Sequence, residues 1–128
     1  MVTRCVLVID DDPLIRELVV ASLGLKGWVV LSSGSGAEGV VLADSRQPDA
    51  ILLDSRMPGM DGMMTLAALR AGSTTGHIPV VMLTAEAGSG GAGPSYDPPV
   101  AAVIAKPFDV MGLPGRVAAA LGWAYDGP

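Results

Sequence analysis

The sequence predicts a single α/β domain built on a mostly parallel, doubly wound sheet with helices on both faces. Short β-like runs alternate along the chain with stretches of helical periodicity, which is the pattern of strand–helix–strand units. The first run, residues 6–9, is continuously apolar, as expected of a strand covered on both faces. Half of the 128 residues are apolar, so the chain can bury one hydrophobic core.

Two strand–helix units occupy the first part of the chain. The strand at residues 6–9 gives way to apolar residues at helical spacing from Leu14, and Gly27 closes that helix. Residues 28–31 form the second strand. A Ser/Gly-rich loop then leads into a second helix at residues 37–46.

Three further strands follow, at residues 49–54, 78–84 and 100–105. A loop rich in Met, Pro and Gly separates the first of them from a helix at residues 63–71. The last helix runs from Asp109 or Met111 to Leu121, and its glycines and proline weaken its first turn.

The segment at residues 87–99 interrupts the alternation of strands and helices because it is rich in glycine and proline. Each glycine costs a helix about 1 kcal/mol and each proline about 3 kcal/mol, so the helix due before the fifth strand is predicted to be degenerate.

Reactive side chains follow four of the five expected strands. They are Asp10, Asp11, Asp54, Thr84 and Lys106. In an open α/β sheet, ligands bind beyond the carboxyl ends of the strands, where the strand order reverses. Right-handed crossovers in the flavodoxin-like order 2-1-3-4-5 place the first and third strands side by side. All five side chains are therefore expected in one cleft.

The chemistry of this cleft follows from its charges. Three crowded carboxylates repel one another unless a cation joins them, and ligands that are all oxygen favour Mg²⁺. Lys106 adds a positive charge and Thr84 a hydroxyl donor. A carboxylate that attacks phosphorus forms an aspartyl-phosphate, and such catalysis consists mostly of positioning and charge stabilisation.

Four runs of residues carry a resemblance to a known family. They are VIDDDP at 8–13, LLDSRMPGMDG at 52–62, LTA at 83–85 and KPF at 106–108. In order and spacing, over nearly its whole length, the chain resembles the receiver domains of bacterial response regulators, which act in two-component signalling.

This resemblance implies that Asp54 accepts a phosphoryl group from a sensor histidine kinase or a histidine phosphotransfer protein, with Mg²⁺ as cofactor. Asp11 would bind the metal directly and Asp10 through water, with Asp54 and the backbone carbonyl of Arg56 as further ligands. Hydrolysis would be slow and self-catalysed, so the domain is expected to be a phosphoacceptor that signals by conformational change and not an enzyme.

The resemblance also implies that Thr84 and Lys106 contact the phosphoryl oxygens, and that the Lys106–Pro107 bond is cis. Five positions are expected to modulate the reaction or the switch: Arg56, Ala85, Glu86, Val103 and Pro107. Arg56 and Glu86 are expected to pair and shield Asp54. Val103 replaces the Tyr or Phe that relatives usually carry three residues before the lysine, so the usual coupling of threonine to aromatic is expected to be altered. Our hypothesis is that residues 87–99 are mobile and become ordered on phosphorylation or on partner binding.

Other polar residues have simpler interpretations. Asp12 precedes a proline at the start of a helix and is predicted to be an N-cap, as is Asp61. His77 is predicted to be a solvated loop residue, and Cys5 a small hydrophobe in the first strand.

Three alternative functions fit parts of the sequence. Residues 34–39 match the dinucleotide fingerprint G-x-G-x-x-G, but in a chain with 17 glycines such a match arises easily by chance. A dinucleotide site would also leave the acidic residues unexplained. Residues 10–12 contain the Asp-x-Asp spacing of phosphatases that resemble haloacid dehalogenases, although Pro13 fits poorly. The third alternative keeps the fold as an interaction module that works without phosphorylation.

Composition limits the partners of the chain. A net charge of −5 disfavours a nucleic-acid surface, and no apolar run reaches the roughly 18 residues of a membrane span. We expect one soluble, cytoplasmic domain, residues 1–128 with an ordered core of about 3–122, that is a monomer or weak dimer. No effector segment follows Gly122, so the chain is expected to be a stand-alone receiver or part of a longer regulator that acts on an unknown protein target.

Overall fold

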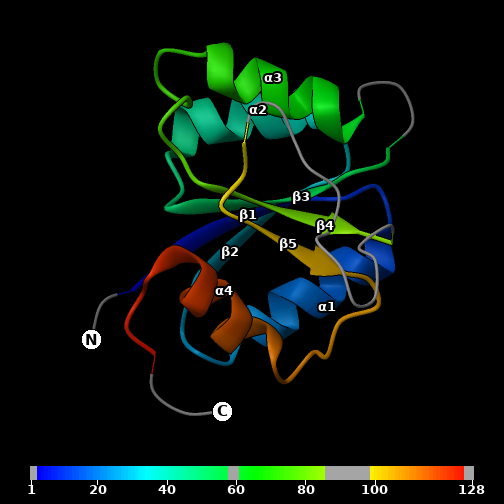
Figure 1. Ribbon diagram of the computed structural model, residues 1–128, viewed down its shortest axis with the longest axis vertical. Helices are drawn as coiled ribbons and strands as arrows, with labels where there is room; N and C mark the ends of the chain where they lie inside the picture. The colour runs from blue at the N-terminus through cyan, green and yellow to red at the C-terminus, as the bar shows by residue number, and fades with distance from the viewer. Residues whose placement is uncertain (1–2, 58–60, 86–98, 126–128) are drawn as a thin grey trace.

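A computed structural model describes residues 3–57, 61–85 and 99–125 (Figure 1). The chain forms one five-stranded sheet in the order β2-β1-β3-β4-β5, and every neighbouring pair is parallel. The strands are β1 (Cys5–Ile9), β2 (Val29–Ser33), β3 (Ala50–Asp54), β4 (Val80–Thr84) and β5 (Ala102–Ala105). The described helices are α1 (Pro13–Gly24), α2 (Gly36–Arg46), α3 (Gly62–Ala71) and α4 (Leu113–Leu121). The predicted fold class and strand order are confirmed.

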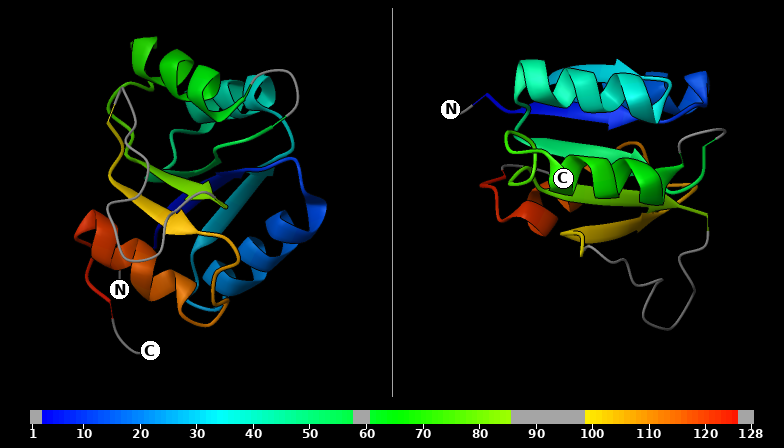
Figure 2. Two further views of the ribbon diagram at one scale, coloured as in Figure 1. Left: turned by 45° about the vertical axis from the view of Figure 1, so that its right-hand side comes forward. Right: turned by 90° about the horizontal axis from the view of Figure 1, so that it is seen from above.

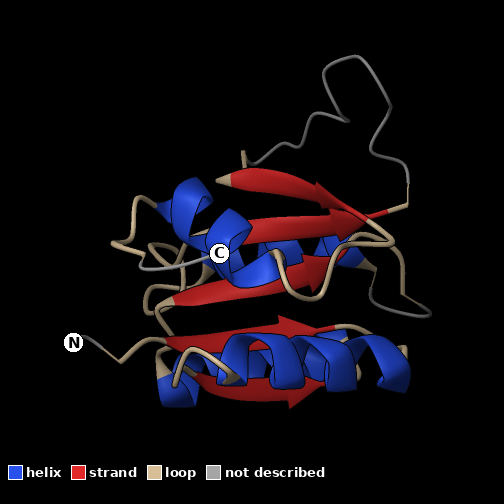
Figure 3. Ribbon diagram, turned by 90° about the horizontal axis from the view of Figure 1, so that it is seen from below, coloured by secondary structure: helices blue, strands red, loops and turns tan. Residues whose placement is uncertain are grey.

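The helices form two layers, one on each face of the sheet. α2 and α3 cover one face, and α1 and α4 cover the other (Figures 1 and 2). Figure 3 shows α1 and α4 from their own side, in front of the strands. Every residue of β3 and β4 is buried. The continuous apolar runs of the central strands are thus explained by helices on both faces.

Three helices begin at side-chain caps. The Asp12 carboxylate accepts a hydrogen bond from the Leu14 N–H at 2.9 Å, and the Asp61 carboxylate accepts one from the Met64 N–H at 2.9 Å. The Ser35 hydroxyl group accepts a hydrogen bond from the Glu38 N–H at 3.2 Å. Each bond satisfies a helix N–H group that has no partner within the helix. The predicted N-caps Asp12 and Asp61 are confirmed.

Two glycines allow helices to approach the strands closely. A Cβ atom on Gly39 would lie 2.4 Å from Cδ1 of Ile9, so a side chain here would force the buried Ile9 side chain to shift where α2 packs on β1. A Cβ atom on Gly62 would lie 2.4 Å from the carbonyl oxygen of Asp54. Gly39, which is the last glycine of the apparent dinucleotide fingerprint, therefore has a packing role.

Several predicted boundaries were wrong by a few residues. β2 begins and ends later than expected, because pairing with β1 continues to the Ile9–Ser33 pair. β4 and β5 begin two residues later than predicted, at Val80 and Ala102. α4 begins at Leu113, after a turn in which the Gly112 N–H bonds to the Asp109 carbonyl at 3.1 Å.

The predicted degenerate helix and mobility of residues 87–99 concern residues that lie, except for Pro99, outside the described part of the chain. Within the described part, none of the helices has the length and hydrophobicity that crossing a bilayer requires.

Candidate functional site

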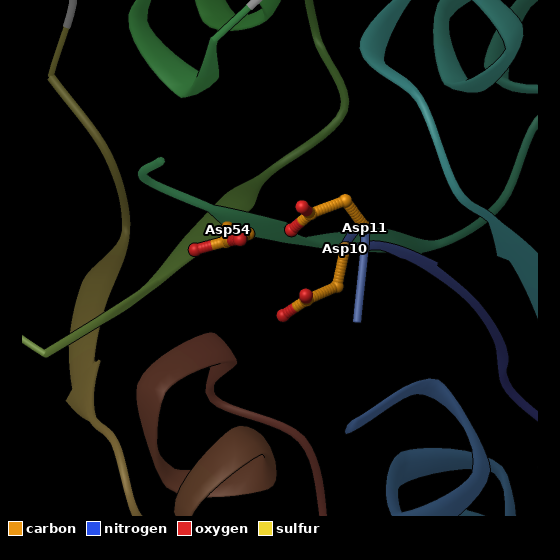
Figure 4. A group of neighbouring side chains, drawn as sticks. All are labelled: Asp10, Asp11 and Asp54. Carbon is orange, nitrogen blue, oxygen red and sulfur yellow. The ribbon is translucent and has the colours of Figure 1, made fainter. Parts of the chain in front are cut away.

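Three carboxylates meet at the carboxyl end of the sheet. Asp10 and Asp11 directly follow β1, and Asp54 is the last residue of the neighbouring strand β3. One carboxylate oxygen from each residue lies within 4.8 Å of the other two. Figure 4 shows the side chains of Asp10 and Asp11 extending from the end of β1 toward Asp54. Asp10 and Asp54 are buried, whereas Asp11 is exposed.

Lys106 provides a positive charge to this cluster from the end of β5. Its Nζ atom lies 2.7 Å from Oδ2 of Asp10 and 3.1 Å from Oδ1 of Asp54. The lysine backbone is fixed by a hydrogen bond from its N–H to the Thr84 carbonyl at 2.9 Å. The Lys106–Pro107 peptide bond is cis, so that expectation is confirmed.

Burial and charge shift the titration of Asp54. Desolvation raises the pKa of its carboxyl group above the usual 3.8, and the nearby charge of Asp10 raises it further. The Arg56 N–H, which donates to Oδ1 at 3.2 Å, and the Lys106 ammonium lower this pKa but do not cancel the effect of burial. The carboxylate is therefore costly to ionise without further positive charge.

The pKa of Lys106 shifts in the direction that keeps its ammonium group charged. Burial lowers the pKa of its ammonium, but the hydrogen bonds and charges of Asp10 and Asp54 outweigh burial and raise this pKa above 10.5. The cleft thus holds a lysine that is cationic at neutral pH between two buried carboxylates.

The remaining predicted residues lie at different depths. Thr84 is fully buried at the end of β4, and the Ser55 N–H bonds to the Leu83 carbonyl beside it at 3.0 Å. Ala85 is exposed, and Val103 is half-buried against the apolar cluster beneath α2 and α3. Glu86 lies outside the described residues, so its predicted pairing with Arg56 stays a prediction.

One residue of the site was not identified from the sequence. The Nη1 atom of Arg16, in α1, donates to the backbone carbonyl of Asp10 at 2.8 Å. A weak signal was available, because a cation within the first turns of a helix is unfavourable toward the helix dipole and needs another reason to be there.

The fold and cleft define a flavodoxin-like α/β domain with an acidic, lysine-containing site at its topological switch point. Residues 6–118 match the model of the response regulator receiver domain, and the chain belongs to this family. The chain is therefore a receiver domain of two-component signalling.

Relatives support this assignment. The chain is 39% identical over 116 residues to the DNA-binding dual master transcriptional regulator RpaA of Synechocystis sp., covering 91% of this chain and 48% of that protein. It is 31% identical over 121 residues to the phosphate regulon transcriptional regulatory protein PhoB of Pseudomonas aeruginosa, covering 94% and 53%. The chain thus spans about half the length of these curated relatives.

Solved structures share the fold. The chemotaxis response regulator CheY4 of Vibrio cholerae matches with a TM-score of 0.80 and 26% identity, covering 93% of this chain and 99% of that chain. The receiver domain of a sensor histidine kinase from Pseudomonas aeruginosa PAO1 matches with a TM-score of 0.80 and 27% identity, covering 94% and 99%. The latter structure has a magnesium ion coordinated in its active-site cleft.

Proposed function

We propose that Asp54 is the phosphoacceptor of this receiver domain and that the phosphoryl group comes from a histidine of a sensor kinase or phosphotransfer protein. The observation that carries this proposal is the position of the Asp54 carboxylate. It lies buried at the switch point of the sheet, 3.1 Å from the Lys106 ammonium and beside two further carboxylates. Family membership supports the same assignment.

The transfer exchanges one bond to phosphorus for another. A carboxylate oxygen of Asp54 attacks the phosphorus atom, and a P–O bond forms as the P–N bond to the donor histidine breaks. The electron pair of that bond stays on the imidazole nitrogen, which then takes a proton. Lys106 and Thr84 are proposed to hold the phosphoryl oxygens, because a lysine ammonium and a hydroxyl group donate to such oxygens.

The acidic residues fit a hard divalent cation. Asp10, Asp11 and Asp54 offer only oxygen ligands, and their close approach is unfavourable without a cation. We propose that these three residues and the Arg56 carbonyl hold Mg²⁺, with Asp10 acting through water. Mg²⁺, when bound, supplies positive charge that neutralises the phosphoryl oxygens.

The aspartyl-phosphate is proposed to be a signal and not an intermediate of turnover. Arg56 and Glu86 would limit the access of water to it, and self-catalysed hydrolysis would end the signal. A downstream protein would read the accompanying conformational change. Membership of the receiver family supports these proposed roles.

Phosphorylation of the chain by a small phosphodonor tests the proposal. The protein is incubated with acetyl phosphate, with Mg²⁺ or with EDTA, and its intact mass is measured. Wild type should gain one phosphoryl group only with Mg²⁺, and Asp54→Asn should gain none. Asp61→Asn is the matched control, because Asn caps a helix as well as Asp, and it should be modified like wild type.

Two outcomes would contradict the proposal. An equal adduct on Asp54→Asn would place the acceptor at another residue. If wild type gained no adduct from acetyl phosphate or from a phosphorylated histidine donor, the chain would work as an interaction module without phosphorylation.

A further inference from the structure

Asp10 is fixed in the cleft by contacts on all of its polar groups. Its N–H donates to the Ser33 carbonyl at 3.1 Å, and Oδ1 accepts from the Asp12 N–H at 2.9 Å. Its backbone carbonyl accepts from Nη1 of Arg16 at 2.8 Å. The Arg16 bond differs from the others because it acts on the peptide group that joins Asp10 to Asp11.

The orientation of that peptide group matters most for Asp11. Among the described residues, the exposed Asp11 carboxylate has no hydrogen bond, so its direction depends on the backbone. A peptide group is planar, and a hydrogen bond that fixes its carbonyl also fixes the direction of the following N–Cα bond. Arg16 therefore influences where the Asp11 carboxylate points relative to Asp54 (Figure 4).

The guanidinium of Arg16 lies against the β2–α2 loop. A Cβ atom on Gly34 would lie 3.1 Å from Nη1 of Arg16 and 3.5 Å from its Cζ atom, so the guanidinium lies in the space that a side chain would fill. The loop at this point is anchored by the buried Ser33, whose hydroxyl group donates to the Ser35 carbonyl at 2.8 Å. The first glycine of the apparent dinucleotide fingerprint thus makes room for an arginine.

We propose that Arg16 and Gly34 together form a positioning device for the Asp10–Asp11 metal-binding turn, and that they set its affinity for Mg²⁺. This inference rests on the proposed function of the site. The guanidinium donates to the Asp10 carbonyl and lies against the anchored β2–α2 loop, so the carboxylates of Asp10 and Asp11 are held ready for the metal. Groups that orient metal ligands in this way usually change affinity by 10- to 100-fold when they are removed.

Calorimetric titration with Mg²⁺ alone measures this effect without any phosphodonor. Arg16→Ala should bind Mg²⁺ about tenfold more weakly than wild type. Arg16→Lys keeps the positive charge and a donor but lacks the flat guanidinium, so its affinity should lie between the two. If Arg16 acted only through its charge, Arg16→Ala would bind Mg²⁺ more tightly, and the proposal would be overturned.

Arg70 provides a matched control for the loss of a loop contact. Its Nη1 atom donates to the Gly76 and Ile78 carbonyls at 3.2 and 2.7 Å, away from the cleft. Arg70→Ala should lose stability in urea unfolding with EDTA, yet bind Mg²⁺ like wild type. An Mg²⁺ affinity lowered equally in both alanine variants would show a general loosening and would overturn the proposal.

Gly34→Val tests the same device without removing the arginine. Gly34 does not have a positive φ, so the substitution changes the space around the guanidinium and not the allowed backbone. It should weaken Mg²⁺ binding several-fold in wild type and have no further effect in Arg16→Ala, because the two residues act as one unit. Additive losses would overturn the proposal.

The two proposals fail in different ways. If wild type does not bind Mg²⁺, the proposed metal site fails and the positioning role falls with it. If wild type binds Mg²⁺ and Arg16→Ala binds it equally well, only the positioning role is wrong.

Discussion

The Nζ atom of Lys106 lies 2.7 Å from Oδ2 of Asp10, although 96 residues separate the two in the sequence. The same ammonium also contacts Asp54. Lys106 is therefore an internal counter-charge for two buried carboxylates, and it stands between the same groups that we propose as metal ligands. A cation of the protein and a cation from solution would thus compete for the same negative charge.

The first prediction concerns Lys106→Met, which removes this counter-charge. With EDTA, the variant should lose about 3 kcal/mol of unfolding free energy, because two buried carboxylates lose their counter-charge and keep only their backbone hydrogen bonds. Mg²⁺ should restore stability, and its stabilising effect should be larger in the variant than in wild type. Urea unfolding with EDTA and with saturating Mg²⁺ measures both quantities.

The other lysine of the chain is the control for this prediction. Lys26 lies 4.7 Å from the centre of the Tyr125 ring, outside the cleft. Lys26→Met should leave the Mg²⁺ effect unchanged. An identical Mg²⁺ effect in wild type and Lys106→Met would show that the lysine does not compete with the metal.

The second prediction concerns the pH dependence of Asp54→Asn. Burial raises the pKa of Asp54 above 3.8, and an acid whose pKa rises on folding lowers stability once the pH exceeds its unfolded-state value. The penalty develops as the pH rises from 3.8 through the folded-state pKa and then stays constant. The substitution should therefore raise the unfolding free energy at neutral pH and leave it unchanged below pH 3.8.

Urea unfolding of both proteins across this pH range, without Mg²⁺, is the measurement. The neutral Asn can still accept the hydrogen bonds of Lys106 and of the Arg56 N–H, so the change isolates ionisation. A gain in stability of the same size at all pH values would mean that packing, and not charge, explains it.

The third prediction concerns Gly62, at the start of α3. In Gly62→Ala the new Cβ atom would lie 2.4 Å from the Asp54 carbonyl oxygen and 2.6 Å from Cα of Ser55, so helix and strand end must separate. We expect a loss of about 2 kcal/mol in unfolding free energy and slower phosphorylation by acetyl phosphate, because Asp54 is displaced.

Gly24→Ala is the matched control for Gly62→Ala. Gly24 ends α1, and apart from its own helix backbone and its chain neighbours no atom of the described residues lies within 4 Å of a Cβ built on it. This change should be neutral or stabilising by up to about 1 kcal/mol, since alanine favours a helix more than glycine does. Equal effects of the two substitutions would contradict the close approach at Gly62.

The sequence predicted the parts of the fold that depend on local patterns. Continuous apolar runs identified the buried strands, and polar residues at their ends identified Asp54, Thr84 and Lys106. The strands, and the meeting of three carboxylates and Lys106 at one edge, were predicted correctly because a parallel sheet brings all strand ends together there. The functional roles of these residues and of Thr84 stay predictions.

Contacts that depend on the conformation of one particular side chain were not predictable in this way. The bond from Arg16 to the Asp10 carbonyl follows from the path of one flexible side chain, which periodicity does not encode. Helix and strand ends were also misplaced, as at Leu113, because local turns such as the one after Asp109 decide them. The contact between Trp28 and Trp123 joins distant segments and was likewise not predicted.

The last prediction concerns this tryptophan pair, because the family match ends at residue 118 and Trp123 lies beyond it. The two rings meet edge to face with centroids 5.4 Å apart, and the guanidinium of Arg4 lies 4.6 Å from the centre of the Trp123 ring. Both tryptophans pack against the apolar cluster beneath α1 and α4. We therefore propose that the folded domain extends beyond α4 as far as Trp123.

Trp123→Ala should cost about 2 kcal/mol of unfolding free energy, and a double-mutant cycle with Trp28→Ala should give a coupling of about 1 kcal/mol. Arg4→Ala should cost less, because a cation over the face of a partly exposed ring contributes only about 0.5 to 1 kcal/mol. Near-ultraviolet circular dichroism should lose the signal of the ring pair in either tryptophan variant. If Trp123→Ala unfolds at the same urea concentration as wild type, Trp123 does not belong to the folded domain, and the core ends near residue 122, as the sequence alone predicts.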